Sequence, residues 1–314
     1  MLRLRAAVLK AMRTFLDERD SLEVVTPVLG RTGVPDVHID SIVLQAAGEP
    51  RYLQTSPEYF MKRLLAAGSG PIYQIGPLFR AGEQGPRHNT EFVMLEWYRP
   101  GLSLHALGRE TEALLQAAAG AAGRDMPAVD VFTYQALFES RYGINPHAAT
   151  TGELRKMAED CYPGFTAHIR DLDDTGTHND YLDLLFSRGI EGSLANVAFV
   201  YDYPEQQAAL ARIKPDDAGN TVARRFECFI DGVEIANAYD ELTDGEELRT
   251  RLALHNQLRR ARDKPPVPLD ENLLAASDAM PDSAGIALGV DRLVQWLAGA
   301  TTLDAVLPFG DGRL

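Results

Sequence analysis

The chain has 314 residues, with 31 Lys and Arg against 45 Asp and Glu, and its formal net charge is −14. Hydrophobic residues make up 45% and charged residues 24%, which is typical of a folded globular protein and excludes wholesale disorder. Such an acidic chain repels polyanions, so a general nucleic-acid binder is disfavoured. No apolar run approaches the ~18 residues that a membrane span needs, and charges at Arg3 and Arg5 interrupt the stretch where a signal peptide would be apolar. We expect no membrane association, a cytoplasmic location, and two buried, reduced thiols at Cys161 and Cys228.

The first elements in chain order are a helix, a strand and a strand–helix–strand unit. Val8, Met12, Phe15 and Leu16 form one apolar stripe and predict a helix that ends near residue 20. Residues 22–28 read as a strand at an edge or an interface, because its proline removes a ladder donor. Residues 51–80 alternate strand, helix, strand, and the order Ser, Pro, Glu at 56–58 predicts the start of that helix.

The rest of the chain adds antiparallel strands and helices. Strands at 72–80 and 91–99 are expected to form a hairpin with a long loop, followed by a helix at 103–123. Residues 131–190 look like a helical insertion, with a capping box at Thr150 and Glu153 and a helix stop at Gly189. A strand at 196–201, a hairpin at 224–239 around the turn 231–232, a helix at 246–262 and a strand–helix pair at 283–297 follow. We therefore predict an α+β fold, an antiparallel sheet flanked by helices, in a single domain over residues 1–314.

Strand 91–99 carries polar groups on one face. Alternation places Val93, Leu95 and Trp97 on a core face, and the opposite face holds Phe92, Met94, Glu96 and Tyr98. The alternative interpretation is an ordinary solvated face.

The hairpin at 224–239 brings two carboxylates together. With a two-residue turn, Glu227 and Glu234 become diagonal neighbours, and Mg²⁺ with nucleotide phosphates would relieve their repulsion. The alternative is an exposed acidic face. Strict alternation sends Asn237 and Tyr239 to the other face, so a shared site requires an irregularity between Ile235 and Asn237.

Two further segments suit anions. In residues 285–292, glycines permit close approach, and Arg292 lies in the first turn of the following helix; close packing and capping by Asp291 are the alternatives. Arg80 ends a strand, and the loop that follows holds Arg87, His88 and Asn89. Arginine side chains bind phosphate oxygens well, and the alternative is an ordinary solvated basic loop.

Taken in order, these segments resemble class II aminoacyl-tRNA synthetases of the lysine branch. Residues 22–27, 79–96 and 285–292 resemble motifs 1, 2 and 3, and residues 55–58 and 234–242 match the lysine-binding segments. Only about twenty residues precede the motif 1 strand, so we expect no anticodon-binding domain. The chain is thereby similar to the elongation factor P–lysine ligases, which activate (R)-β-lysine or lysine with ATP and attach it to a lysine of elongation factor P.

The resemblance implies a role for each matching residue. Arg80 would hold the α-phosphate and the substrate carboxylate, and Arg292 the γ-phosphate; these two would be the catalytic residues. Around ATP it implies His88, Asn89, Phe92 stacked on adenine, Glu234, Ile235 and Gly289, with Glu227 and Glu234 on Mg²⁺. Around the substrate it implies Ser56, Pro57, Glu58, Glu96, Tyr98, Asn237, Tyr239, Glu241 and Ala287. Among these, Glu58, Tyr98 and Glu241 would surround the side-chain ammonium, while Glu96 and Asn237 would meet the amino and carboxylate end.

Two positions depart from the lysyl-tRNA synthetase pattern. Gly82 stands where motif 2 usually has Glu, with Glu83 one residue later, so either ATP binding is weakened or the backbone makes the adenine contact expected of that Glu. Ala287 stands where those synthetases have Gly and bears on β-lysine preference. The implied partners are elongation factor P and a second copy of the chain, without tRNA. A synthetase-like enzyme with another acceptor, or an inactive paralogue acting as an interaction protein, are the alternatives.

Overall fold

The computed structural model describes residues 1–170, 172 and 175–310, and the chain falls into two compact units. Unit 1 comprises Met1–Met126 and Glu241–Leu314, and unit 2 comprises Pro127–Asp240.

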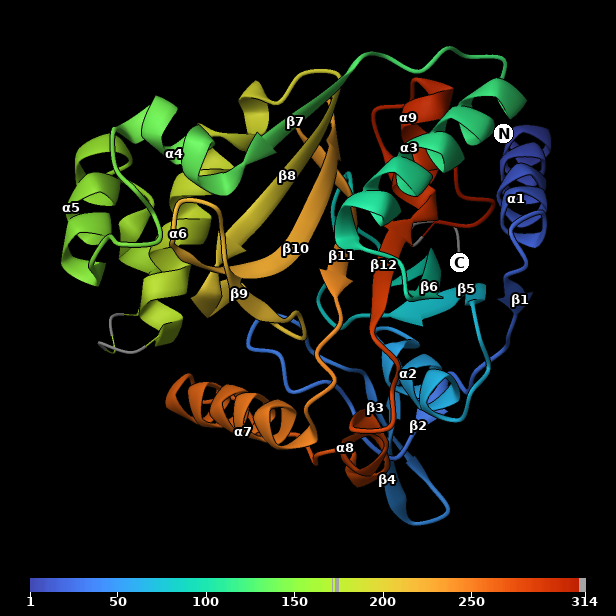
Figure 1. The fold of residues 1–314 in the computed structure, drawn as a ribbon, viewed down its shortest axis with the longest axis horizontal. Helices are drawn as coiled ribbons and strands as arrows, with labels where there is room; N and C mark the ends of the chain where they lie inside the picture. Colours follow the sequence, from blue (N-terminus) through green and yellow to red (C-terminus); the bar gives the residue numbers. More distant parts are fainter. Residues whose placement is uncertain (171, 173–174, 311–314) are drawn as a thin grey trace. The chain divides into compact units, whose positions relative to one another are not determined.

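A mainly antiparallel sheet forms the centre of unit 1 (Figure 1). Its strands, in spatial order, are β1 (Leu22–Glu23), β5 (Ile72–Phe79), β6 (Glu91–Pro100) and β12 (Ser283–Gly289). β6 pairs antiparallel with β5 and with β12, so the predicted hairpin is confirmed. β1 pairs parallel with β5 at the end of this order, which confirms the predicted edge position.

The first strand is shorter than the sequence pattern indicates. Beyond β1, the amide of Thr26 donates to the side-chain oxygen of Gln74 (2.8 Å) and not to a strand backbone. The prediction of a strand over residues 22–28 is therefore wrong beyond Glu23. Just before Pro27, the Gln74 side chain takes the place of the backbone acceptor that a strand pair would supply.

Helices cover the sheet of unit 1, and a small second sheet completes this unit. Contacts link α9 to β6, α3 to β12 and α1 to both helices. Trp97 donates from its indole nitrogen to Glu110 of α3 (2.9 Å), which shows that the Val93–Leu95–Trp97 face is the core face, as predicted. The elements are α1 (Leu2–Asp17), α2 (Glu58–Ala66), α3 (Leu104–Ala121), α7 (Gly245–Ala261), α8 (Glu271–Ser277), α9 (Val290–Ala298) and η4 (Leu303–Ala305), with the sheet β2 (Leu29–Gly30), β4 (Glu49–Leu53) and β3 (Val43–Ala46).

Unit 2 packs helices against its own strands. The strand order is β11 (Val233–Asp240), β10 (Thr221–Ile230), β8 (Val197–Pro204) and β7 (Val129–Thr133), with β9 (Ile213–Pro215) on β10. Its helices are α4 (Tyr134–Tyr142), α5 (Thr151–Cys161) and α6 (Thr175–Gly189), with the short turns η1 (Thr166–His168), η2 (Glu191–Ser193) and η3 (Glu205–Gln207). The capping box of Thr150 and Glu153 is present at α5, as predicted.

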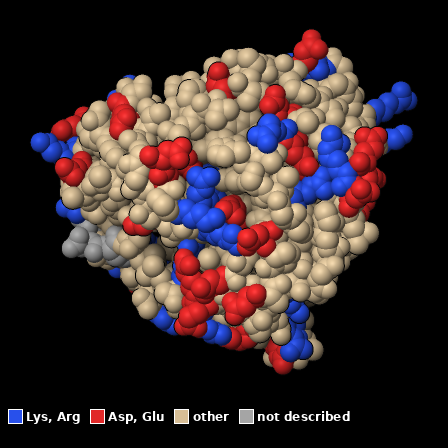
Figure 2. Space-filling model, viewed as in Figure 1, with Lys and Arg blue, Asp and Glu red and all other residues tan. Residues whose placement is uncertain are grey.

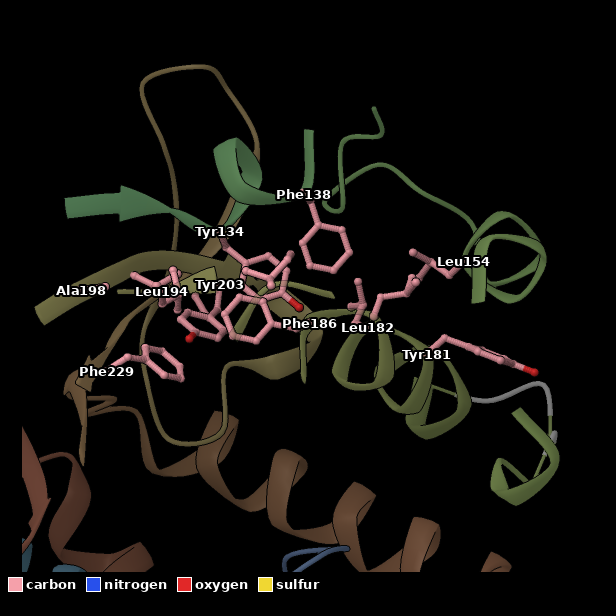
Figure 3. Packing of buried hydrophobic residues seen from close by; sticks show 14 of the residues in the cluster. Tyr134, Phe138, Leu154, Tyr181, Leu182, Phe186, Leu194, Ala198, Tyr203 and Phe229 are labelled. Carbon is pink, nitrogen blue, oxygen red and sulfur yellow. The ribbon is translucent and has the colours of Figure 1, made fainter. Parts of the chain in front are cut away.

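Aromatic side chains build the core of unit 2 (Figure 3). Tyr134 of α4 stacks on Phe186 of α6 with ring centroids 4.9 Å apart. Phe186 also meets Phe229 of β10, with centroids 5.9 Å apart. These contacts fix α4 and α6 on the strand pair β8–β10, so the helical insertion shares one core with the hairpin.

Two local predictions in unit 2 need correction. Gly189 is the last residue of α6 but does not adopt the left-handed conformation of a helix stop. A Cβ there would collide with the hydroxyls of Tyr142 and Tyr162, so close packing explains this glycine. Cys161 is exposed and only Cys228 is buried, because Cys161 ends α5 on its solvent side.

Candidate functional site

Carboxylates from three parts of unit 1 converge on the polar face of β6. Ser56 donates to Glu96 Oε1 (2.8 Å), and the Tyr98 hydroxyl donates to Glu96 Oε2 (3.3 Å). Lys62 then connects the other two carboxylates, since its Nζ lies 2.7 Å from Glu58 and 2.6 Å from Glu241. We call Glu58, Glu96 and Glu241 the carboxylate cluster.

Two members of the cluster are buried, and Glu58 is partly buried. Glu96 is 1% exposed and Glu241 is also 1% exposed, so the solvated-face interpretation of strand 91–99 is wrong. The register pairs Gly285 with Tyr98 and Ala287 with Glu96, which places small residues beside the polar ones. A Cβ at residue 285 would collide with Glu241 and with the Tyr98 ring, so glycine is what lets these two side chains lie over β12.

Burial changes the proton affinities of this group. Burial, reinforced by the charge of Glu58, raises the pKa of Glu96 to about 8, although Ser56, Tyr98 and Arg80 counteract it. Burial lowers the pKa of Lys62, but Glu241 and Glu58 outweigh it and hold that pKa above its usual value. Glu96 is therefore largely protonated at neutral pH, while Lys62 is charged.

Lys62 was not foreseen from the sequence as a member of this cluster. It follows Glu58 by four positions, a spacing that places both side chains on one helix face. That local signal predicts an ordinary surface pair; it does not reveal the contact with Glu241, 179 positions away by sequence number.

The start of the helix also differs by one residue from its prediction. α2 begins at Glu58, so Pro57 precedes the helix, and the Ser56 hydroxyl accepts from the Glu58 amide (3.0 Å). Ser56 thus contacts both the helix start and Glu96.

Arg80 lies directly beyond β5, next to the ring of Phe92. Its guanidinium carbon is 5.0 Å from the ring centroid, and its Nε is buried without a hydrogen-bond partner. Its charge also acts on Glu96. Arg80 thus brings a cation and an unused donor to the same β6 face as the cluster.

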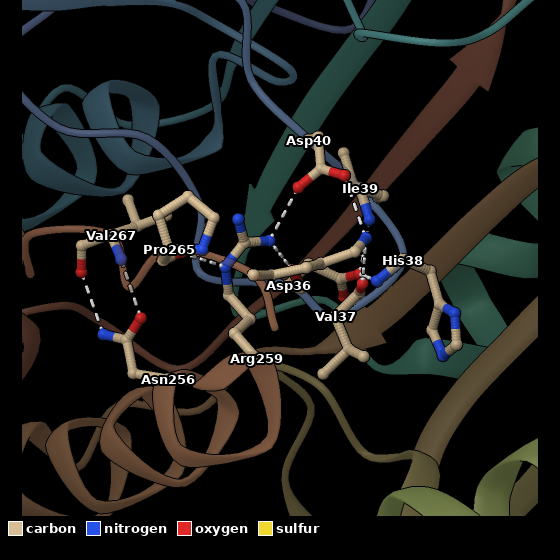
Figure 4. A network of polar contacts seen from close by, with 10 residues as sticks. Asp36, Val37, His38, Ile39, Asp40, Asn256, Arg259, Pro265 and Val267 are labelled. Atoms are coloured by element: carbon tan, nitrogen blue, oxygen red, sulfur yellow. Dashed lines mark hydrogen bonds and ion pairs between the residues drawn. The ribbon is translucent and has the colours of Figure 1, made fainter. Parts of the chain in front are cut away.

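A polar network fixes the segment of residues 36–40, which contacts the backbone just after Arg80 (Figure 4). Arg259 of α7 donates to the Asp36 carbonyl (2.6 Å) and to the Asp40 carboxylate (2.9 Å), and Lys264 donates to the same carboxylate (2.8 Å). The Asp40 carbonyl in turn accepts from the amide of Ala81 (2.8 Å). The network therefore fixes the backbone immediately after Arg80.

The loop between β5 and β6 contacts Arg292 of α9. Arg292 Nη2 lies 2.8 Å from His88 Nε2, and Arg292 Nε donates to the Arg87 carbonyl (3.3 Å). Asn89 instead donates to the backbone carbonyl of Glu91 (2.6 Å). The structure thus brings together His88 and Arg292, two of the residues expected at the triphosphate, and both are partly exposed.

Gly82 and Asp291, which lie in the segments that resemble motifs 2 and 3, have roles in the backbone and in packing. Gly82 has φ +77°, a left-handed conformation that favours glycine at this position. Asp291 does not cap α9, contrary to one alternative. Its buried carboxylate joins Arg5 (2.6 Å) and the Val93 amide (2.7 Å) and so links α1, β6 and α9.

Unit 2 holds a second group of predicted site residues on the hairpin β10–β11. The register pairs Phe229 with Glu234 but Cys228 with Ala236, so Ile235 is an extra residue in β11. This bulge starts one residue earlier than predicted, and it has the predicted effect. Glu227 pairs directly with Asn237, so Glu234 and Asn237 share one face.

Resident partners surround Glu227. It forms an ion pair with Arg225 and accepts from the Tyr203 hydroxyl (2.7 Å), while Arg225 lies over the rings of Tyr203 and Tyr239 at 4.3 and 5.6 Å. Burial raises the pKa of Glu227 to about 7, with Arg225 opposing the rise and Glu234 adding to it. Arg225 and Tyr203 were not foreseen from the sequence.

The residues present fit Mg²⁺ by their chemistry. Asn237 Oδ1 is buried without a hydrogen-bond partner, on the face that carries Glu227 and Glu234. Amide and carboxylate oxygens are the ligands that Mg²⁺ accepts, with phosphate and water completing the shell. Among the described residues, no three His, Cys, Asp or Glu side chains gather in a group that could hold a metal ion.

Charged side chains of both signs lie on the surface. Acidic and basic side chains are interspersed over the face shown in Figure 2.

In the part of the chain that the structure describes, every helix is too short or too polar to cross a bilayer.

The chain matches a family and several relatives over nearly its full length. The family model for class II tRNA synthetases (D, K and N) matches residues 1–313. The chain is similar to proteins named elongation factor P–(R)-β-lysine ligase from three bacteria. Identity is 43% with that of Erwinia tasmaniensis, 41% with that of Haemophilus influenzae and 40% with that of Klebsiella pneumoniae, each over 97% of this chain and 93% of the relative. The chain belongs to the elongation factor P–(R)-β-lysine ligase family of class II tRNA synthetases.

Membership of this family confirms the predicted fold class.

The residues that the family resemblance implies are distributed over both units. Unit 1 holds the carboxylate cluster, Arg80, Arg292 and Ala287, and unit 2 holds Glu227, Glu234 and Asn237. Gly289 immediately precedes α9 and pairs with Met94 of β6. The roles of these residues toward ATP and substrate are predictions.

Proposed function

We propose that this ligase activates (R)-β-lysine, or lysine, with ATP and transfers the aminoacyl group to a lysine side chain of elongation factor P. One observation carries the proposal: the carboxylates of Glu58 and Glu241 share the single ammonium of Lys62, in a cluster with the buried Glu96, on which the charge of Arg80 also acts. Such an acidic group favours a cationic substrate, because an uncharged amino acid would leave part of its negative charge unbalanced.

The reaction proceeds in two balanced steps. The substrate carboxylate attacks the α-phosphorus of ATP, and pyrophosphate leaves as the aminoacyl-adenylate forms. The neutral ε-amine of the acceptor lysine then attacks the adenylate carbonyl, which forms an amide, expels AMP and releases a proton. Positioning and charge neutralisation account for most of the acceleration in such phosphoryl chemistry.

The residues of this chain divide those tasks. Arg80 would bind the α-phosphate, with its unpartnered Nε as an available donor, and Phe92 beside it would stack on adenine. His88 and Arg292, already in contact, would bind the outer phosphates. Glu227 and Glu234 would hold Mg²⁺, which neutralises phosphate charge when bound.

The decisive experiment weighs the product. The purified chain is incubated with ATP, Mg²⁺, elongation factor P and either (R)-β-lysine or lysine, and the intact mass of elongation factor P is measured. A mass gain of one aminoacyl group that depends on ATP supports the proposal. Robust charging of tRNA with no mass gain would instead favour a synthetase with another acceptor, and no lysine-dependent pyrophosphate exchange would favour an inactive paralogue.

We also propose that the ligase works in the cytoplasm as a homodimer through the face around β1. Val25, just after β1, is 92% exposed, and Leu22 and Val28 near it in the chain are exposed as well. Leu29, Val43 and Leu44 are exposed on the second sheet of unit 1. Exposed apolar side chains in such number mark an interaction surface. Light scattering after size exclusion tests this: a monomer at micromolar concentration would contradict it.

A further inference from the structure

The contacts of Lys62 set it apart from ordinary surface lysines. The residue is 3% exposed, and its ammonium lies between carboxylates of α2 and of the segment after β11. Ion pairs this deeply buried add little stability relative to apolar side chains of similar volume, so stability alone is a weak reason for this arrangement.

The charge balance of the cluster gives a stronger reason. Two carboxylates, those of Glu58 and Glu241, contact one ammonium, that of Lys62. With Lys62 present, Glu58, Glu241 and Lys62 together retain about one negative charge, which one further ammonium neutralises. Without Lys62, two carboxylates would repel each other in a low-dielectric site.

The geometry explains how Lys62 acts on both carboxylates. Glu58 is anchored by α2, but Glu241 lies beyond the end of β11, at a point where its amide donates to the Ser283 carbonyl (2.9 Å). A single ammonium bridging the two side chains fixes the distance between an element of the first half of the chain and one of the second.

We propose that Lys62 is a positioning residue for substrate recognition: its ammonium holds Glu58 and Glu241 in place and balances one of their charges, so that this pair accepts one further ammonium, that of the substrate side chain. The inference rests on the proposed function. It names Lys62 as the cation that determines how much negative charge is left for the substrate to neutralise. Lys62 itself contacts carboxylates and does not react.

The test removes the ammonium and then returns it. Lys62→Ala deletes the side chain beyond Cβ, and n-propylamine matches the missing atoms, while n-propanol has the same size without the charge. Arg63→Met is the matched control, because it removes a positive charge from the next residue of α2, whose guanidinium lies over Phe60.

We expect a defect specific to the amino acid. In lysine-dependent ATP–pyrophosphate exchange, Lys62→Ala should raise the KM for lysine by roughly tenfold or more, which is the effect of losing one favourable contact. The KM for ATP should not change. n-Propylamine should recover activity, n-propanol should not, and Arg63→Met should resemble the wild type.

A second measurement needs no substrate. n-Propylamine should raise the melting temperature of Lys62→Ala but not that of the wild type or Arg63→Met, because only the first has unpaired cluster carboxylates. A wild type without lysine-dependent exchange would overturn the proposed function, and the melting temperatures would still decide the role of Lys62.

Two results would overturn the inference. One is a wild-type KM for lysine in Lys62→Ala. The other is a loss of activity in Lys62→Ala with no response to n-propylamine in either assay, which would indicate a packing role. If Lys62→Ala does not fold, Lys62→Met keeps the volume: a rise in the KM for lysine alone supports the inference, and an unchanged KM refutes it.

Discussion

Replacing Glu96 by Gln should change how the stability of the protein depends on pH. The pKa of Glu96 is about 8 in the folded protein against an ordinary value of 4.5, because the carboxyl is buried beside Glu58. The folded state therefore binds the proton more tightly than the unfolded state. This contribution to stability is fully present below pH 4.5 and is lost as the pH rises through 8.

The magnitude follows from these two values. Between pH 5 and pH 8 the linkage removes about 3.5 kcal/mol from the free energy of unfolding of the wild type. Gln resembles the protonated carboxyl, since its amide oxygen can still accept from Ser56 and it does not titrate. Glu96→Gln should therefore gain about 3.5 kcal/mol relative to the wild type across this range.

Urea unfolding of both proteins at each pH unit from 5 to 8 measures this difference, and the subtraction cancels the titration of the other carboxylates. Glu159→Gln, on the exposed side of α5, is the control and should follow the wild type. A gap between Glu96→Gln and the wild type that changes by less than about 1 kcal/mol would refute the buried, proton-binding carboxyl.

Three further changes test other parts of the molecule. Glu241→Gln should abolish lysine-dependent pyrophosphate exchange while nucleotide binding, followed by equilibrium titration, persists; wild-type exchange would show that Glu241 does not select the substrate. Arg225→Met leaves Glu227 buried without its cation, so urea unfolding should show a loss of about 3–5 kcal/mol, and a loss below 1 kcal/mol would mean that Glu227 simply takes up a proton. Phe186→Ala removes the ring that stacks on Tyr134 and should cost about 3–5 kcal/mol in the same assay; full stability would contradict the packing of this core.

Local sequence signals predicted many elements because their causes lie within a few residues. The capping box at Thr150 needs only Glu153, and the turn at residues 231–232 needs two residues that tolerate positive φ, as both do here. The alternation in strand 91–99 gave the correct core face for the same reason. The resemblance to a known family then supplied the candidate roles, which spacing alone does not contain.

The sequence by itself determined the periodicities, the turn and cap positions, the acidic composition and the order of the motifs. Only the tertiary structure decided that Lys62 meets Glu241, that Asp291 joins α1 to β6, and that Ile235 is the extra residue in β11. Each of these depends on segments far apart in the chain or on the register between strands. Burial is likewise a property of the folded chain, and it is burial that makes Glu96 a proton-binding group and not a solvated carboxylate.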